Sequence, residues 1–200
     1  MPYDYRYWEK VMRTLIFFGS PRSNGNTRHL LDTCLDQLEG EHMIVDCCHT
    51  AIAACTDCRW CRHHAGCSIR DSMDAVYPWV EEADAVIIAS PVHMGTLSGP
   101  LLSVLSRLQT YWSSKFIRTS EKVPPRKKAG ALLLTAGSTD SRMEASAEYA
   151  AAFAFKLLNA DVVGSVLALD TDHRDTMSQP KILQKTREIG TALKQWKPLL

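Results

Sequence analysis

Two kinds of hydrophobic pattern alternate along the chain. Short, continuous apolar runs are typical of strands that are buried on both faces of a sheet, and five such runs predict strands. They cover residues 13–19, 42–47, 84–90, 129–136 and 161–169. Apolar residues that recur at helical spacing predict five helices between and after them. These helices cover residues 26–38, 71–82, 98–112, 141–159 and 178–196, and residues 113–128 form a long irregular segment.

Strands that alternate with helices predict an α/β fold, a doubly wound five-stranded parallel sheet in three layers (αβα). We expect a single domain over residues 1–200, with an N-terminal extension at 1–12 and a cysteine-rich loop insertion at 48–70. Asp71 or Ser72 is the expected cap of the second helix, and Ser141-Arg-Met-Glu144 fits a capping box. Arg126-Lys-Lys128, before a strand, is interpreted as a solvated turn.

Ligands of such sheets bind outside the carboxyl ends of the strands, where the loops 19–26, 48–70, 90–98 and 136–140 meet. The first of these reads Gly19-Ser-Pro-Arg-Ser-Asn-Gly-Asn-Thr27. Backbone N–H groups at the helix start, with nearby hydroxyls and Arg22, can surround a phosphate. A Walker A loop is excluded because five residues separate Gly19 from Gly25 and Asn26 replaces the lysine. The alternative is a polar turn that caps the helix.

The loop Ser90-Pro-Val-His-Met-Gly-Thr-Leu-Ser-Gly-Pro100 follows the neighbouring strand. Pro91 and Gly95 stiffen and open the backbone, so that its N–H groups can meet the edge of a flat ring. Beside a phosphate loop, this pattern favours a mononucleotide with a flat ring. An ordinary strand-to-helix loop is the alternative.

Seven cysteines need an explanation in a chain of this composition, and Cys55, Cys58, Cys61 and Cys67 fall within 13 residues. Successive Cys-x2-Cys spacings let one loop wrap an iron–sulfur cubane, although the last gap is longer than in ferredoxin-type runs and no Pro follows. Three interpretations stay open: a [4Fe–4S] cluster, a zinc ion, or reduced structural thiols. The other three cysteines (Cys34, Cys47 and Cys48) are expected to be ordinary buried thiols.

The composition and net charge of the chain exclude several classes of function. The chain is 46% hydrophobic and 22% charged, which excludes a disordered protein. A formal net charge of +1 gives no field that would attract nucleic acid or an anionic membrane. No apolar run approaches the roughly 20 residues of a spanning helix, and the first residues lack the apolar stretch of a secretory signal. The sequence therefore predicts a cytoplasmic protein that binds neither nucleic acid nor membranes.

Together these motifs resemble the NADPH-dependent FMN reductase family of flavodoxin-like proteins. The resemblance rests on Gly-Ser-Pro-Arg-x-x-Gly-Asn-Thr at 19–27, on Arg70-Asp-Ser-Met73 after the cysteines, and on the segment from Ala83 through Gly95 with Ser98-Gly-Pro100. It covers about residues 13–171. The four cysteines are similar to those of the iron–sulfur flavoprotein branch.

The resemblance implies a flavodoxin-like domain that binds FMN without a covalent bond and assembles as a homodimer or homotetramer. The implied phosphate contacts are Ser20, Arg22, Ser23, Gly25, Asn26 and Thr27. The ring is expected against Pro91, Val92, His93, Met94 and Gly95, with Ala136, Gly137 and Ser138 closing one side.

Three positions depart from the family pattern. His93 stands where relatives often have Tyr, which affects ring stacking and the flavin potential. Leu102 replaces a frequent Lys, and Ser106 replaces the Asp before Arg107. The last two changes put helix-face salt bridges in question and leave the phosphate site untouched.

The expected function is an FMN-dependent oxidoreductase. NAD(P)H, or an iron–sulfur cluster, supplies electrons to FMN, which reduces a small acceptor such as a quinone, a flavin, a nitro or azo compound, or oxygen. No catalytic side chain is assigned because the chemistry belongs to the flavin. Two alternatives stay open: an electron carrier between protein partners, with a ferredoxin-type donor, and a flavin-binding redox sensor.

Overall fold

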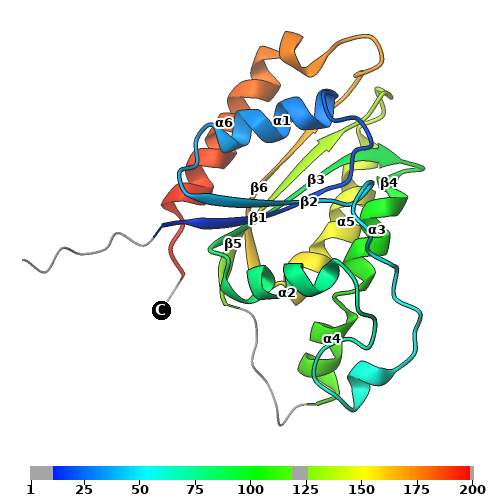
Figure 1. Ribbon diagram of the computed structural model, residues 1–200. Helices are drawn as coiled ribbons and strands as arrows, with labels where there is room; N and C mark the ends of the chain where they lie inside the picture. Colours follow the sequence, from blue (N-terminus) through cyan, green and yellow to red (C-terminus); the bar gives the residue numbers. More distant parts are fainter. Residues whose placement is uncertain (1–10, 119–125, 199–200) are drawn as a thin grey trace, which may run out of the picture.

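A parallel sheet lies between two layers of helices in the computed structural model, which describes residues 11–118 and 126–198. The strand order is β2 (Glu41–Asp46), β1 (Arg13–Phe18), β3 (Ala85–His93), β5 (Lys128–Thr135) and β6 (Ala160–Ala168). Helices α1 (Asn26–Leu35) and α6 (Pro180–Gln195) cover one face. The other face is covered by α2 (Met73–Glu82), α3 (Gly99–Ser106) and α5 (Arg142–Leu157), and α4 (Gln109–Phe116) continues from α3 (Figure 1).

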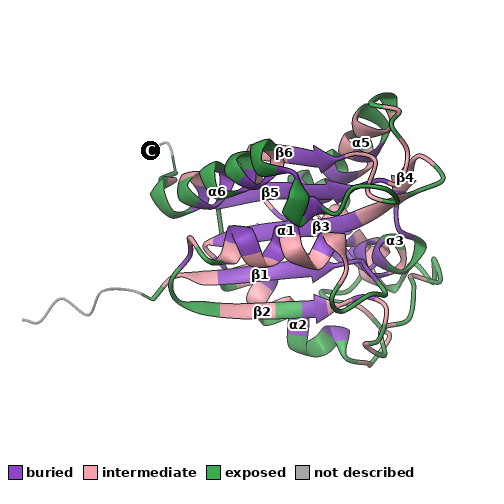
Figure 2. Ribbon diagram, turned by 90° about the horizontal axis from the view of Figure 1, so that it is seen from above, coloured by how far each residue is buried: buried purple, intermediate pink, exposed green. Residues whose placement is uncertain are grey.

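The central strands β1, β3 and β5 carry buried, mostly apolar runs because each face of the sheet has its own core. Leu15 and Phe17 of β1 belong to the cluster on the side of α2, α3 and α5, whereas Ile16 and Phe18 belong to the cluster beneath α1 and α6. Figure 2 shows the central strands buried and the outer helix surfaces exposed. The predicted three-layer parallel fold is therefore confirmed.

The loop after Ser90 differs from the prediction. Strand β3 continues to His93, and a short sixth strand, β4 (Thr96–Leu97), pairs with it in antiparallel fashion. Met94 and Gly95 form the turn with φ of 50° and 74°. The segment expected to be a plain loop is thus a tight hairpin, for which Gly95 is suited because it tolerates positive φ.

The predicted helix at 98–112 is two helices. Arg107 N–H donates to Val104 O and Leu108 N–H donates to Leu105 O, so the chain tightens into i→i+3 bonds between α3 and α4. Helix α4 then runs to Phe116, into the segment predicted to be irregular. Of that segment, residues 119–125 lie outside the described residues, as do residues 1–10 of the expected N-terminal extension.

Aspartates, rather than serines, cap two helices. Asp71 Oδ1 accepts from the Met73 N–H at 2.9 Å, which agrees with its prediction as a cap of α2. The predicted capping box of Ser141 and Glu144 is wrong, because Ser141 makes no side-chain cap bond. Asp140, one residue earlier, accepts from the Arg142 N–H instead. A carboxylate is the stronger acceptor for a helix-start N–H.

Lys128 is wholly buried, which contradicts its interpretation as part of a solvated turn. Its ammonium donates to Val80 O at 2.9 Å, to Leu158 O at 3.0 Å and to Arg126 O at 2.5 Å. The first two carbonyls lie near the C-termini of α2 and α5, where helices leave carbonyls unpaired. Lys128 therefore ties two helices to the start of β5.

None of the helices in the two described ranges has the length and apolar character that a membrane span requires.

Candidate functional site

A pocket of about 300 Å³ opens at the carboxyl ends of β1, β3 and β5. Three of the loops that were expected to meet at this edge contribute to its wall. Nine predicted cofactor residues line it: Ser20, Arg22, Gly25, Asn26, Thr27, Pro91, Val92, His93 and Gly137. The structure thus brings the predicted phosphate loop, the predicted ring segment and the loop after β5 to one cavity.

Five predicted cofactor residues are not on this wall: Ser23, Met94, Gly95, Ala136 and Ser138. Met94 is fully exposed at the tip of the β3–β4 hairpin, because the turn directs it away from the sheet. Ala136 is buried, and its backbone pairs with Ala168 and Thr171. Ser23 lies on the exposed side of its loop.

The start of the phosphate loop is packed tightly against α3. Ser98 Oγ donates to Gly19 O at 2.7 Å, and a Cβ at Gly19 would lie 2.8 Å from Leu101 Cβ. No side chain caps the N-terminus of α1, which begins directly after Gly25. The N–H of Arg28 donates to Gly25 O, whereas the N–H groups of Asn26 and Thr27 and the positive end of the helix dipole are available to an anion in the pocket.

The side chains of Asn26 and Thr27, which were expected to contact the phosphate, also form hydrogen bonds within the protein. Thr27 Oγ1 and Thr135 Oγ1 share a buried hydrogen bond of 2.8 Å, which joins α1 to β5. Asn26 Oδ1 accepts from the Thr176 N–H at 2.8 Å, and its amide donates to Thr171 O. Both side chains shape the pocket, and their contacts with a phosphate stay a prediction.

Four wall residues were missed by sequence reasoning: Pro21, Thr135, Thr171 and Asp172. Thr171 and Asp172 follow β6, the fifth strand of the predicted parallel sheet. The same rule that singled out the other loops also applies to this one. The Asp172 carboxylate lies against Gly137, where an added Cβ would collide with it.

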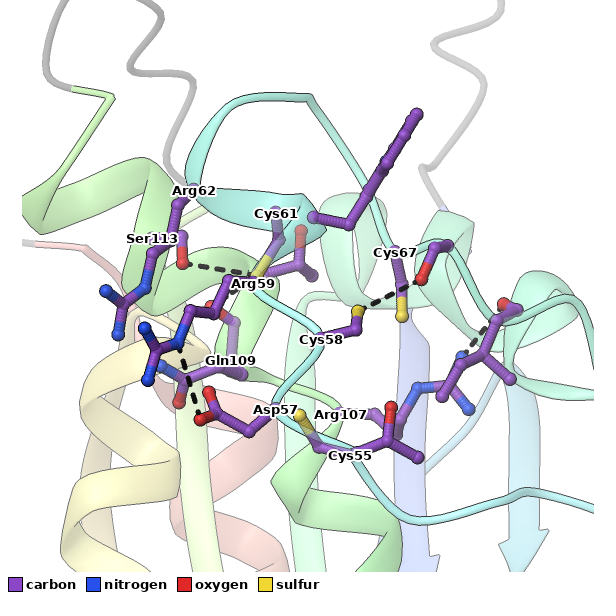
Figure 3. Close-up of a pocket in the computed structure, with 15 residues that line it drawn as sticks. Cys55, Asp57, Cys58, Arg59, Cys61, Arg62, Cys67, Arg107, Gln109 and Ser113 are labelled. Atoms are coloured by element: carbon purple, nitrogen blue, oxygen red, sulfur yellow. Dashed lines mark hydrogen bonds and ion pairs between the residues drawn. The ribbon is translucent and has the colours of Figure 1, made fainter.

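The four clustered cysteines line a second, smaller pocket of about 20 Å³ (Figure 3). It lies between the long loop that follows β2 and the helices α3 and α4. Cys61 Sγ contacts Ser113 Oγ at 3.2 Å, and Cys58 Sγ contacts Ser68 Oγ at the same distance. Of the three remaining cysteines, Cys34 and Cys47 are buried as predicted, whereas Cys48 is only half-buried.

The sulfur atoms line one pocket without surrounding one point. Within residues 11–118 and 126–198, no three His, Cys, Asp or Glu side chains converge closely enough to hold a metal ion. The donor chemistry, four thiols in one loop, suits soft metals and iron–sulfur clusters. A closer approach of the sulfurs therefore requires the loop to tighten, and the cluster stays a prediction.

Arg107 holds the two ends of the cysteine loop together. Its fully buried side chain donates to Ala53 O at 3.0 Å and to Ile69 O at 3.1 Å, and it pairs with Asp71 at 2.6 Å. Asp71 in turn accepts from the Ala53 N–H. Burial disfavours the charged form of Asp71, but the hydrogen bond from Arg107 outweighs it and holds the pKa of Asp71 below its ordinary value.

Helix α3 connects the two pockets. At its start, Ser98 contacts the first residue of the phosphate loop, Gly19. At its end, Ser106 Oγ accepts from the Cys55 N–H at 2.9 Å. The serine that replaces the family's Asp at this position therefore binds the backbone of the cysteine loop. Eight residues of α-helix span about 12 Å, and the two pockets are therefore near neighbours.

In the metal-free protein, the thiol of Cys58 is expected to be alkylated faster than that of Cys34. It is exposed, and the hydrogen bond with Ser68 lowers its pKa, whereas burial raises the pKa of Cys34 to about 12. Peptide mapping after brief iodoacetamide treatment at pH 8 should find Cys58 modified before Cys34. Ser68→Ala should slow the alkylation of Cys58 several-fold and Ser141→Ala should not; equal rates in both variants would refute the role of Ser68.

Comparison with known proteins places these features in a wider group. The model of the NADPH-dependent FMN reductase family matches residues 12–174. An iron–sulfur flavoprotein of Archaeoglobus fulgidus is 36% identical over 103 residues, which are 50% of this chain and 47% of the relative. An iron–sulfur flavoprotein of Methanosarcina thermophila is 28% identical over 129 residues, 63% and 64% of the two chains. The chain spans about half the length of the first of these relatives.

Solved structures share the fold. An NAD(P)H:quinone oxidoreductase from Methanothermobacter marburgensis has a TM-score of 0.68 at 15% identity and covers 95% of this chain and 100% of its own. An azoreductase from Bacillus anthracis has a TM-score of 0.62 at 14% identity, with coverage of 92% and 100%. At such identities the likeness concerns the fold alone.

Proposed function

The chain belongs to the NADPH-dependent FMN reductase family, and from this we propose that it is an FMN-dependent oxidoreductase that passes electrons from NAD(P)H to a small acceptor. The observation that carries the proposal is the 300 Å³ pocket at the carboxyl edge of the sheet. It joins an anion-binding helix start to a wall formed by Pro91, Val92 and His93.

The residues present fit FMN. Arg22 and the backbone N–H groups at the start of α1 hold the phosphate, because they combine a positive charge with unpaired donors. The turn at Gly19 has no room for a side chain, which fixes the course of this loop. The segment from Pro91 to His93 receives the ring. When bound, FMN would supply two-electron redox chemistry between NAD(P)H and the acceptor.

The acceptor is proposed to be a small compound such as a quinone, a free flavin, a nitro or azo compound, or oxygen. The pocket supports this because it opens to solvent beside the β3–β4 hairpin, whose tip is exposed. Steady-state oxidation of NAD(P)H by the FMN-loaded protein with a small quinone tests the proposal. Turnover supports it, and a protein that oxidises NAD(P)H with none of these acceptors contradicts it.

An electron carrier is the second candidate, favoured by the four cysteines of one pocket and by the short helix between the pockets. In this version Cys55, Cys58, Cys61 and Cys67 bind a [4Fe–4S] cluster, and a ferredoxin-type protein is the electron donor. Relatives named iron–sulfur flavoproteins support it. Anaerobic purification with iron and acid-labile sulfide analysis is the test. About four irons per chain support the cluster, and fewer than about two, or zinc instead, overturn it.

Replacing Arg22 by Ala is expected to weaken FMN binding about tenfold, because one charge-assisted hydrogen bond to the phosphate is lost. Titration of FMN fluorescence measures the dissociation constant. Arg28→Ala is the matched control, since Arg28 lies in the next turn and pairs with Asp32 instead of lining the pocket. Equal affinities in the two variants would remove Arg22 from the phosphate site.

We further propose a homodimer or homotetramer in the cytoplasm. Light scattering of the purified protein measures the assembly, and a monomer at all concentrations would contradict it.

A further inference from the structure

Two buried hydrogen-bond donors beside Cys67 have no acceptor among the residues that the structure describes. Arg107 lines the cysteine pocket, and its Nε–H is buried without an acceptor among the described residues. The hydroxyl of Tyr77, which projects from α2, lies behind this pocket in the lining of another one and is buried without an acceptor among the same residues. Buried donors without acceptors are rare in folded proteins because each one costs desolvation energy. Two of them at the same place indicate that an acceptor belongs there.

Both donors lie next to Cys67. The Cys67 thiol is close enough to act electrostatically on both the Tyr77 hydroxyl and the Arg107 guanidinium. Figure 3 shows Arg107 and Cys67 at the same side of the pocket. Arg107 stays protonated here although burial disfavours its charge, because the hydrogen bond with Asp71 raises its pKa. The surroundings of Cys67 are therefore rich in hydrogen-bond donors, and they suit sulfur that carries negative charge.

Arg107 also determines where Cys67 lies. Its bonds to Ala53 O and Ile69 O close the loop just outside the first and the last of the four cysteines. The ion pair with Asp71 fixes the guanidinium at the start of α2, the helix that carries Tyr77. The loop is thus held at its two ends by a rigid group, and the bonds of Cys55 to Ser106 and of Cys61 to Ser113 hold the part between them against α3 and α4.

We propose that Arg107 and Tyr77 are positioning residues for the cluster, which donate hydrogen bonds to sulfur on its Cys67 side and stabilise its reduced form. The inference rests on the proposed [4Fe–4S] site and goes beyond it by assigning two residues outside the cysteines. Reduction adds one negative charge to the cluster, so each donor favours the reduced state. Loss of the Tyr77 hydroxyl should therefore lower the reduction potential.

The test uses the full chain, reconstituted anaerobically with iron and sulfide, and a redox titration followed by electron paramagnetic resonance. Tyr77→Phe should bind as much iron as the wild type and show an equilibrium constant for reduction about tenfold smaller, which is about 59 mV for a one-electron couple. Tyr149→Phe, on the exposed face of α5, is the matched control and should leave the potential unchanged. Arg107→Lys should fold and lose most of its iron, whereas Arg142→Lys should retain it.

The outcomes separate the two levels of the proposal. An iron-loaded Tyr77→Phe variant with the wild-type potential, or a fully loaded Arg107→Lys variant, overturns the role of that residue and leaves the cluster intact. A wild-type chain that binds FMN but takes up no iron overturns the cluster and this inference together, while the FMN-dependent activity stands.

Discussion

Arg107→Met is expected to lower the free energy of unfolding by about 3–5 kcal/mol, because removal of one partner leaves a largely buried charge on Asp71 without compensation. The carbonyls of Ala53 and Ile69 lose their donors in the same step. Methionine keeps the apolar stem of arginine but not its guanidinium, so the loss combines charge, hydrogen bonding and the space that the guanidinium fills. For a chain of this size the melting temperature should fall by about 10 °C.

Thermal unfolding followed by circular dichroism measures this effect. Arg142→Met is the matched control, because Arg142 forms its ion pair with Asp140 on the exposed surface, where such pairs contribute little. We expect its melting temperature to stay within about 2 °C of the wild type. Similar melting temperatures for both variants would show that Arg107 does not hold the cysteine loop.

The free energy of unfolding of the wild type, minus that of the Lys128→Met variant, is expected to increase with pH between about 8 and 10.5. Burial lowers the pKa of Lys128 from 10.5 to about 8, while the unfolded chain keeps an ordinary lysine. In this window the unfolded state therefore holds more protons, and the free energy of unfolding increases with pH. The full gain is about 3 kcal/mol, and it is absent below pH 8, where both states are protonated.

Urea unfolding of both proteins at a series of pH values gives this difference, in which the titration of all shared groups cancels. Lys127→Met is the control, because Lys127 is half exposed and pairs with Asp161 at the surface. Its difference from the wild type should stay flat over the same range. A flat difference for Lys128→Met as well would mean that its amine is not desolvated.

The layers of the fold were predictable because they depend on pattern alone. Continuous apolar runs such as 84–90 are typical of strands with two covered faces, and their alternation with helices predicts a parallel sheet. Local details were less accessible where two signals compete. Ser141 looked like a cap, but a carboxylate one residue earlier forms the bond instead. Lys128 looked solvated because the carbonyls that bind it come from two distant helices.

The position of the candidate site was predictable because it depends on where the parallel strands end. The loops after β1, β3 and β5 meet as expected, because parallel strands end at one edge. The roles of individual side chains were harder to predict. The sequence does not show that Asn26 is engaged by Thr176, 150 residues further on, or that the hairpin turns Met94 outward. Such contacts depend on tertiary packing, which local motifs do not encode.

Binding of FMN to the purified chain tests the central claim most directly. The apoprotein, titrated with FMN, should bind one flavin per chain, and its fluorescence should be quenched with a sharp end point. Riboflavin, which lacks the phosphate, should bind far more weakly, because the start of α1 and Arg22 then have no anion to hold. A chain that binds neither flavin, or that binds riboflavin as tightly as FMN, would contradict the assignment of this pocket.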